Sequence, residues 1–466
     1  MELVELIKTE PQKAINLIKN RCFMDFTKIK NLKSEFDLID RNLRDTQIGK
    51  VQKDKMIGEG EKRKKVSSVR IPVPFQNKIV TTSTAFEVGE PVSLVPSEAN
   101  DLTEEIERLW EANRVDSSIM KMVSLRKSEL QSALLFYIKD VDKNKTFNKK
   151  LGSNKNKEIK TKVLENKYGV MSPYFDEYGD MKLFMWEFTL KDEENKETKH
   201  AWIYDETKVY KLKSTTGKME LMDSEDHGFS KIPIVYTAQD KPEWHISEKM
   251  IDRLEVSLSK LGNSNDYAGH PILKLYGDVE GAPDKDEDGK AFRLEQKETD
   301  DGKIISSDVE FLTHDNAPES VKLELDRLEK YIYSLSSTPD ISFDNIKGLG
   351  TISGVAIKLM FLDAMIKATM NNTSLNQPMI ERIINVFISG TIETRLTNLK
   401  KYVENTYIKV QFNSIIPDDI KETIETYASA VDSGIMSVET AIKKLDLVKD
   451  VEKEMEGIKT EKAPVE

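Results

Sequence analysis

The sequence predicts a mainly α-helical protein of the α+β class. A segment around residue 328 has the apolar spacing of a packed helix, whereas residues 168–235 alternate as strands do. Hydrophobic residues make up 38% of the 466 residues and charged residues 32%, so the chain can form a core but should be extensively solvated. This length suggests roughly three domains.

The strongest helix prediction covers Ser320 to Leu335. Its apolar residues recur at intervals of four and three, which is typical of a helix that packs one narrow seam against its neighbours. That seam consists of Val321, Leu325, Leu328, Ile332 and Leu335. The helix should end before Pro339, because proline disfavours helix in the preceding residue and lacks an N–H donor. A loop containing Gly348 and Gly350 then leads to a second helix, predicted from Val355 to about Thr373.

The N-terminal part of the chain should consist of short helices joined by turns. Amphipathic patterns predict helices at Pro11 to Asn20, Asn31 to Leu43, Lys78 to Phe86, Leu102 to Asn113 and Met120 to Tyr137. Residues 69–77 should be extended, and their two prolines exclude a central strand. Residues 143–167 carry nine lysines and two glutamates, a net charge of +7. We expect a solvated, mobile loop there, with contact to DNA or an acidic partner as the alternative.

Residues 168–235 should form an antiparallel sheet. Three segments have strand composition and are separated by polar turns: Met181 to Leu190, Lys199 to Tyr204 and Lys208 to Lys213. A helix is then predicted from Ser247, its candidate N-cap, to Leu261. Residues 265–316 interrupt the two long helices with three short predicted strands, Pro271 to Tyr276, Ala291 to Glu295 and Ser307 to Leu312. A small β unit should therefore lie at the tip of a helical hairpin.

The C-terminal part should contain one strand and a helix pair. The strand is predicted at Ile408 to Phe412, and the helices at Asp418 to Val431 and Val438 to Leu447. Gly434 suits a C-cap and Ser437 an N-cap. The acidic segment from Asp450 to Glu466 is expected to fray.

One segment matches the pattern of a calcium-binding loop. Asp284, Asp286, Asp288 and Glu295 occupy ligand positions, with Gly289 at the turn. Such a loop also needs an amphipathic helix on each side, whereas glycines and Pro283 precede this one and strand-like residues follow it. We interpret it as a polar β-turn, and a weak metal site is the alternative.

Other chemical motifs are missing from the sequence. Gly348 to Gly354 has Ser353 where a dinucleotide fingerprint needs glycine, and no P-loop pattern is present. The five histidines lack the spacing of metal ligands and no catalytic constellation is found, so we expect neither an enzyme nor a cofactor.

The single cysteine, Cys22, is typical of a reducing compartment, and neither a signal peptide nor a membrane span is expected. The net charge of −11 argues against a general nucleic-acid clamp, but not against a surface that DNA slides past.

Several segments, taken in order, resemble the portal proteins of tailed bacteriophages, whose ring admits and releases DNA at the capsid. They are Asn77 to Val80, Phe86 to Val92, Leu109 to Asn113, Ile232 to Val235, Met250 to Leu254, Ser336 to Asp340, Ser353 to Lys358 and Ile416 to Asp419. The resemblance covers about residues 65–450. It implies an α+β protomer with wing, stem, clip, tunnel loop and a short helical crown, because the chain stops soon after residue 450.

The resemblance also implies boundaries for these parts. N-terminal helices would occupy residues 1–64, the wing 65–246, the stem helices 247–264 and 317–337, and the clip 265–316. The tunnel loop would occupy residues 338–353, a long helix and wing return 354–416, and the crown 417–466. Asp340, Phe343, Asp344, Asn345, Lys347, Gly348 and Gly350 would line the tunnel and face DNA.

The implied function is structural. The protein would form a ring of twelve subunits that serves head assembly, genome packaging, neck attachment and DNA ejection. Its partners would be double-stranded DNA, the large terminase subunit, a neck or adaptor protein, and the major capsid and scaffolding proteins. It would reside at the portal vertex of the virion and in the host cytoplasm during assembly. Two alternatives are a metal-dependent nucleic-acid-processing enzyme that uses Asp284, Asp286, Asp288 and Glu295, and a generic virion scaffold or adaptor.

Overall fold

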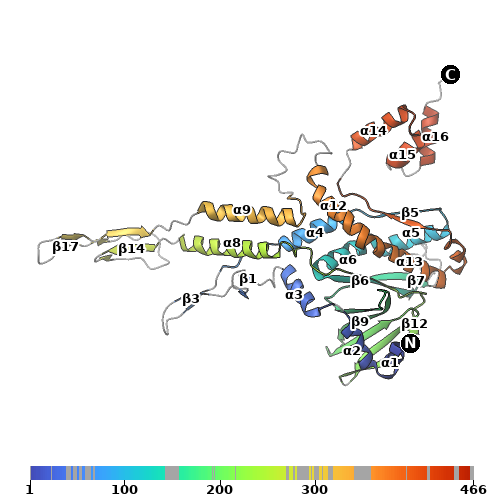
Figure 1. Cartoon of the computed structure of the whole chain (residues 1–466), viewed down its shortest axis with the longest axis horizontal. Coiled ribbons are helices and arrows are strands. Elements are labelled where there is room, and N and C mark those ends of the chain that lie inside the picture. The colour runs from blue at the N-terminus through green and yellow to red at the C-terminus, as the bar shows by residue number, and fades with distance from the viewer. Residues whose placement is uncertain are drawn as a thin grey trace.

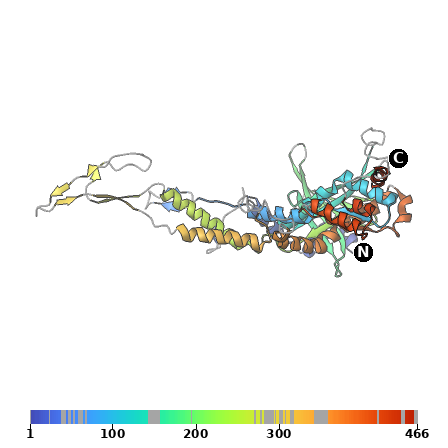
Figure 2. The same cartoon turned by 90° about the horizontal axis from the view of Figure 1, so that it is seen from above.

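The computed structural model describes residues 2–22, 24–37, 44–45, 50–51, 55–57, 64–66, 69–141, 157–191, 193, 195–215, 217–268, 272–276, 279–280, 293–294, 296–298, 304–306, 308–312, 318–340, 358–394, 396–416, 420–445 and 451–461. Figure 1 shows a body of packed helices and sheets from which helices α8 (Glu248–Ala268) and α9 (Pro318–Leu335) project side by side. Short strands lie at the far end of this helix pair, and both views show the same elongated shape (Figure 2).

The body consists of helices on both sides of two sheets. One sheet has the strand order β12-β11-β10-β9-β8 and the other has the order β13-β6-β7, and the neighbouring strands in both are antiparallel. The strands are β6 (Gln131–Asp140), β7 (Lys157–Leu164), β8 (Gly169–Phe175), β9 (Met181–Lys191), β10 (Glu197–Tyr204), β11 (Lys208–Thr215), β12 (Lys218–Asp226) and β13 (Ile234–Ala238). The antiparallel sheet predicted for residues 168–235 is therefore present.

Alternate side chains of the central strands belong to different apolar cores of the body. In β6, Leu134 and Phe136 belong to the core shared with the large helices, whereas Ala133 and Leu135 belong to the core between the two sheets. In β9, Phe184 faces the inter-sheet core and Met185 belongs to the core beneath the N-terminal helices. This period-two distribution stacks helices, sheet, sheet and helices into successive layers.

Two predictions in this region are wrong. The helix predicted for Met120 to Tyr137 ends at Glu129, because Leu130 has a φ of +68° and β6 begins at the next residue. Since β6 is buried on both faces, its apolar run looked the same as a buried helix in the sequence. The lysine-rich segment is not a loop throughout, because residues 157–164 form β7 against β6, with Ile159 buried.

The N-terminal helices cover the outer face of the five-stranded sheet. They are α1 (Glu2–Thr9) and α2 (Pro11–Arg21), whose buried residues Ile7, Ala14 and Ile15 pack on that sheet. Helix α3 spans Phe26–Phe36, not residues 31–43 as predicted, because the Asp25 side chain caps its first turn and the backbone becomes extended at Asp37.

Helices α4 (Phe75–Val88), α5 (Asp101–Asn113) and α6 (Val115–Glu129) form the centre of the body. The predicted helix at residues 102–113 is confirmed as α5, and its apolar face is buried: Leu102, Ile106, Leu109 and Trp110. Asn100 begins this helix by accepting hydrogen bonds from two backbone N–H groups. The extended segment predicted for residues 69–77 ends at Pro74, because Phe75 already belongs to α4.

That extended segment runs along helix α8 rather than joining a sheet. The N–H groups of Val69, Ile71 and Val73 donate to the side chains of Asn263, Ser259 and Glu255, at 3.2, 3.0 and 2.8 Å. Two residues of extended chain advance about 6.7 Å and four residues of helix about 6 Å, so the two periods nearly match. Pro72, between Ile71 and Val73, has no N–H group that would need a partner.

The helix predicted to end near Thr373 continues much further. Helix α12 (Leu362–Asn371) passes through a π-helical turn, η2 (Asn372–Asn376), into α13 (Gln377–Thr394). Pro378 cannot donate to the preceding turn and its ring crowds the carbonyl four residues earlier, and a widened π turn accommodates both defects. The predicted start at Val355 lies outside the described residues.

The remaining elements are short. The far end of the helix pair holds the antiparallel pairs β14 (Ile272–Tyr276) with β19 (Asp308–Leu312), β15 (Val279–Glu280) with β16 (Arg293–Leu294), and β17 (Gln296–Glu298) with β18 (Ile304–Ser306). Near the N-terminus β1 (Arg44–Asp45) pairs with β2 (Lys50–Val51), and β3 (Lys55–Ile57) with β4 (Lys64–Val66). The predicted strand at residue 408 is β20 (Ile408–Gln411), which pairs with β5 (Ser93–Pro96) and follows the 3₁₀ helix η3 (Thr397–Tyr402).

The C-terminal helix pair is α14 (Ile420–Asp432) and α15 (Val438–Leu445). Gly434 has a φ of +73° after α14, and the Ser437 hydroxyl accepts from the Thr440 N–H, as the capping prediction requires. The predicted fraying is wrong for residues 451–461, which form helix α16 (Val451–Glu461).

Candidate functional site

Five ionisable side chains meet in the interior where helices α4, α6 and α12 come together. This junction cluster consists of Glu87 of α4, Arg126 and Lys127 of α6, Glu243 before α8, and Lys367 of α12. The side chains of Glu87, Arg126 and Lys127 are fully buried. Each of these charges therefore depends on protein groups rather than water for its stabilisation.

Glu87 is the central acceptor of the cluster. Its Oε1 accepts from Lys127 Nζ at 2.7 Å and from Asn371 Nδ2 at 2.6 Å, and its Oε2 accepts from Asn376 Nδ2 at 3.0 Å. Its backbone carbonyl accepts from Asn372 Nδ2 at 3.1 Å. The carboxylate thus ties α4 to both ends of the π-helical turn.

A chain of ion pairs continues from Glu87 to the end of helix α9. Lys127 Nζ lies 3.1 Å from Glu243 Oε1, which also accepts from Lys367 Nζ and the Ser83 hydroxyl, each at 2.7 Å. Lys367 Nζ donates in addition to the backbone carbonyl of Ser336, at 2.9 Å. The last turn of α9 is therefore connected through α12 to the centre of the body.

The electrostatics of the cluster favour its charged form. Burial alone would raise the pKa of Glu243, but attraction to Lys127 and Lys367, with hydrogen bonds from Lys367 and Ser83, lowers that pKa to about 2. Burial lowers the pKa of Arg126, and the Glu87 and Glu243 carboxylates oppose this effect. Arg126 Nη1 donates to Thr237 at 3.0 Å, and its Nη2 lies 3.6 Å from Glu87. Such a network fixes the positions of the helices that it joins, and it contains no group placed to react with a substrate.

The predicted seam of α9 faces α8 and the base of the body. Ile332 is fully buried, and Leu325 and Leu328 are partly buried against the same core, which includes Trp244 and Leu254. Val321 is also partly buried, whereas the Leu335 side chain is 50% exposed in the single chain. Arg253 of α8 and Glu324 of α9 form a hydrogen-bonded ion pair at 2.6 Å beside this seam.

Helix α9 ends where the sequence predicts. The Ser336 hydroxyl turns back to the Ile332 carbonyl at 2.6 Å, and Ser337 has a φ of +55°, which ends the helical path. Asp340 is exposed at the end of this segment. The other predicted tunnel residues lie outside the described residues: Phe343, Asp344, Asn345, Lys347, Gly348 and Gly350.

The candidate calcium loop also lies outside the described residues, since the structure describes none of Asp284, Asp286, Asp288 and Glu295. Within the described ranges, no group of three or more His, Cys, Asp or Glu side chains could hold a metal ion. No helix in the same ranges is long and apolar enough to cross a membrane.

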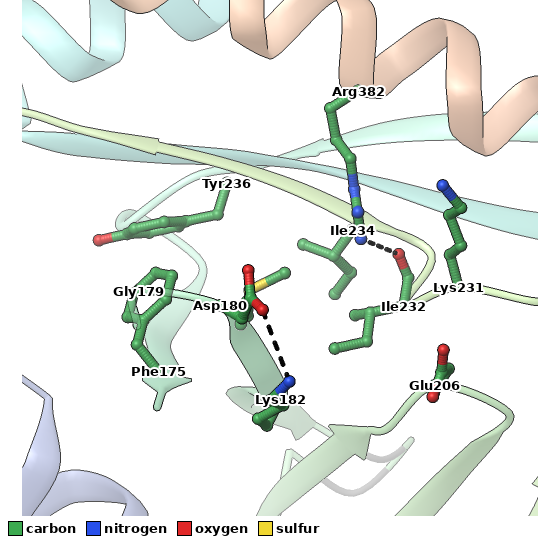
Figure 3. Close-up of a pocket in the computed structure, with 11 residues that line it drawn as sticks. Phe175, Gly179, Asp180, Lys182, Glu206, Lys231, Ile232, Ile234, Tyr236 and Arg382 are labelled. Carbon is green, nitrogen blue, oxygen red and sulfur yellow. Dashed lines mark hydrogen bonds and ion pairs between the residues drawn. The ribbon is translucent and has the colours of Figure 1, made fainter. Parts of the chain in front are cut away.

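A separate pocket of about 460 Å³ lies between the two sheets and α13 (Figure 3). Arg382 of α13 reaches into it and donates to the Ile232 carbonyl at 3.4 Å, and burial lowers the pKa of Arg382. Lys182 and Asp180, which both line the pocket, lie 3.7 Å apart. None of the lining groups is a nucleophile held by a base, so the pocket offers no catalytic arrangement.

Sequence reasoning missed the junction cluster. Glu87, Glu243 and Lys367 are far apart in the chain, and each looks like an ordinary surface residue in its own helix or turn. One signal was present: Asn371, Asn372 and Asn376 interrupt an apolar helix just before a proline. Asparagines at helical spacing in such a place indicate a buried polar partner or a distorted turn.

The chain is similar to a known protein family and to solved structures. Residues 13–465 match the family described as "Phage portal protein, SPP1 Gp6-like". Among solved structures, a chain of the "Neck of empty GTA particle computed with C6 symmetry" is similar, with 11% identity and a TM-score of 0.38. That match covers 80% of this chain and 89% of the other. No curated protein sequence matches the chain.

Proposed function

Because this chain belongs to the SPP1 Gp6-like family of phage portal proteins, we propose that twelve copies assemble into the ring through which double-stranded DNA enters and leaves the capsid. Portal proteins form the DNA channel at one capsid vertex, and this chain is a ring-forming virion component of that kind. The family is structural, so the function is carried by shape and by contacts rather than by a reaction.

We propose a division of the protomer that the order of its elements supports. We assign the stem to α8 and α9, the clip to the strands between them, and the wing to the sheets with their covering helices. The tunnel loop is assigned to residues 338–353 and the short crown to α14, α15 and α16. The projecting helix pair with strands at its tip supports this division (Figure 1).

One observation supports the tunnel assignment: the described stretches before and after residues 341–357 both contact Lys367 or contain it, and Lys367 belongs to the junction cluster. Lys367 of α12 binds the Ser336 carbonyl at the end of α9, four residues before Asp340. The same lysine pairs with Glu243 and so with the buried centre of the body. A loop that touches moving DNA needs fixed supports, and this arrangement supplies one on each side.

The charge of the chain suits a passage for DNA. A net charge of −11 per subunit gives little counterion-release attraction, so phosphates should slide past without being held. In the assigned tunnel loop, Asp340 and Asp344 outnumber Lys347 among the charged residues from 340 to 350. Contact through apolar side chains such as Phe343 would then act by shape rather than by charge.

The remaining partners follow from the same assignment. The terminase large subunit would dock during packaging, and a neck or adaptor protein would replace it afterwards. Major capsid and scaffolding proteins would contact the outside of the ring during assembly in the host cytoplasm. No part of this scheme requires a cofactor.

Electron microscopy of the purified full-length chain tests the proposal. We expect closed rings with a central channel, and mass photometry should give the mass of about twelve subunits, as expected for closed cyclic symmetry. A chain that stays monomeric at micromolar and higher concentrations would contradict the ring.

A further inference from the structure

Helix α12 turns its large apolar side chains away from its own body. Its small residues Ala364 and Ala368 are buried, whereas Ile366 and Met370 are 50% and 66% exposed. The exposed stripe also includes Leu359 and Leu362. A helix covered only by its own chain would show the reverse arrangement, with large apolar residues inward. This face is therefore suited to a partner.

The same face borders a groove along α9 and α12. One hollow of about 680 Å³ is lined by Asp326, Glu329, Asp340 and Asp363, with Lys330 and Met360. A second of about 340 Å³ continues along α12 past Ile366, Lys367 and Met370. We call these two hollows the α9–α12 groove. Its apolar lining includes Met360, Ile366 and Met370, and four carboxylates accompany Lys330 in its larger hollow.

Like charges lie close together at the acidic end of the groove. Burial raises the pKa of the Glu329 carboxyl, and the nearby Asp340 and Asp326 carboxylates raise it further. Burial also raises the pKa of Tyr333, and the Asp340 and Glu329 carboxylates raise it further. A cationic side chain placed here would relieve repulsion among the carboxylates. DNA is excluded as the occupant, because its phosphates would add to that repulsion.

Another face of α9 carries the complementary chemistry. Arg327, Tyr331 and Leu335 are spaced by four residues, so they form one stripe along the helix. All three are exposed, Tyr331 to 53%. This stripe, the α9 ridge, presents one cation followed by two large apolar groups. The groove presents carboxylates near α9 and an apolar stripe along α12, so the two surfaces match in both respects.

We propose that the α9–α12 groove of one subunit receives the α9 ridge of the adjacent copy of this chain, an inference that rests on the ring of the proposed function. Arg327 pairs with the groove carboxylates, and Tyr331 and Leu335 cover the apolar stripe of α12. Groove and ridge are different surfaces, so the contact is head-to-tail, which is the kind that closes a ring. It is a helix-in-groove contact.

Charge reversal tests this pairing in the full-length chain. Arg327→Glu and Glu329→Arg, each alone, should reduce the ring fraction seen by mass photometry at least tenfold. The double variant should restore it, because each interface then pairs the exchanged charges. Both side chains lie outside the core, so circular dichroism should show unchanged folding. Lys199→Glu on β10 is the matched control, since Lys199 is exposed and faces Thr189 across the sheet.

Cysteine cross-linking gives an independent readout. In a Cys22→Ser background, Tyr331→Cys with Ile366→Cys should yield a ladder of covalent multimers on oxidation. Tyr178→Cys with Ile366→Cys should not. Wild-type rings combined with no ladder and no effect of charge reversal would overturn the groove contact while leaving the portal function intact. A wild-type chain without rings would overturn both.

Discussion

Lys367 and Glu243 form an ion pair, with Nζ 2.7 Å from Oε1, that joins helix α12 to the segment just before α8. The same Nζ binds the carbonyl of Ser336 at the end of α9. One side chain therefore fixes three separate stretches of chain around the assigned tunnel loop. Since Lys127 holds Glu243 from the other side, displacement of α12 would disturb the buried charges of the whole cluster.

The first prediction concerns Glu87, whose carboxylate is the centre of the junction cluster. Glu87→Gln keeps the shape of the side chain but leaves Lys127 and Arg126 without their nearest negative charge. Breaking a buried pair from one side costs about 3–5 kcal/mol of unfolding free energy. Guanidinium denaturation should show this loss. Glu111→Gln, at an exposed position of α5, should leave stability unchanged. Equal stability of the two variants would contradict the assigned role of Glu87.

The second prediction concerns pH and Glu243. The folded state lowers the pKa of Glu243 from 4.5 to about 2, so its contribution is complete above about pH 4.5 and is lost as the pH falls toward 2. Wild-type protein should exceed Glu243→Gln in stability by about 3 kcal/mol at neutral pH. Thermal unfolding measured from pH 6 to pH 2 should show this difference shrinking only below about 4.5. A constant difference across that range would rule out the depressed pKa.

The third prediction concerns the packing of α13 on the sheets. An added Cβ at Gly390 would overlap the Phe229 ring and lie 2.9 Å from the Ile159 side chain. Gly390→Ala should therefore destabilise by about 1–3 kcal/mol despite the better helix propensity of alanine. Gly457 of α16 meets nothing within 4 Å, so Gly457→Ala is the matched control and should be neutral or slightly stabilising. Chemical denaturation of both variants compares them directly.

The sequence predicts an element well where one face is polar. Helix α5 has a regular apolar face and an asparagine cap, and both its ends were predicted within one residue. Strand β6 was mistaken for helix because cores on both sides bury it, which removes the alternation that identifies strands. The π-helical turn was missed because the hydrogen bond that Asn376 of this turn donates to the buried Glu87 of another helix is a tertiary contact.

Site residues were predictable to different degrees. The seam of α9 followed from heptad spacing, since Ile332 must be buried wherever that helix packs. The junction cluster could not be predicted, because the pairing of Glu87 with Lys127 depends on how α4 crosses α6. Nothing local marks either residue as buried, and charged side chains are exposed in most proteins.

The fourth prediction concerns the extended segment along α8. Ser259→Ala removes the acceptor of the Ile71 N–H group, which is 3.0 Å from the serine hydroxyl. An unpaired partly buried donor costs about 1–3 kcal/mol, so this segment should open more often. Hydrogen exchange followed by mass spectrometry should show faster exchange in residues 69–74. The exposed Ser117→Ala on α6 serves as the control and should leave that peptide unchanged. Unaltered exchange in the Ser259 variant would refute the contact.

The last prediction concerns the assigned tunnel loop. Deleting residues 342–349 leaves Asp340 and Lys358 joined by the remaining chain, and it does not touch the α9 seam or the junction cluster. Rings should therefore assemble normally, which electron microscopy can establish as the internal control. Packaging of DNA, or its retention in filled heads, should fail, because the loop no longer reaches the DNA. Measured as nuclease-protected DNA per particle, the yield should fall at least tenfold. Mutant rings that package and retain full-length DNA would show that the narrowest contact with DNA lies elsewhere in the channel.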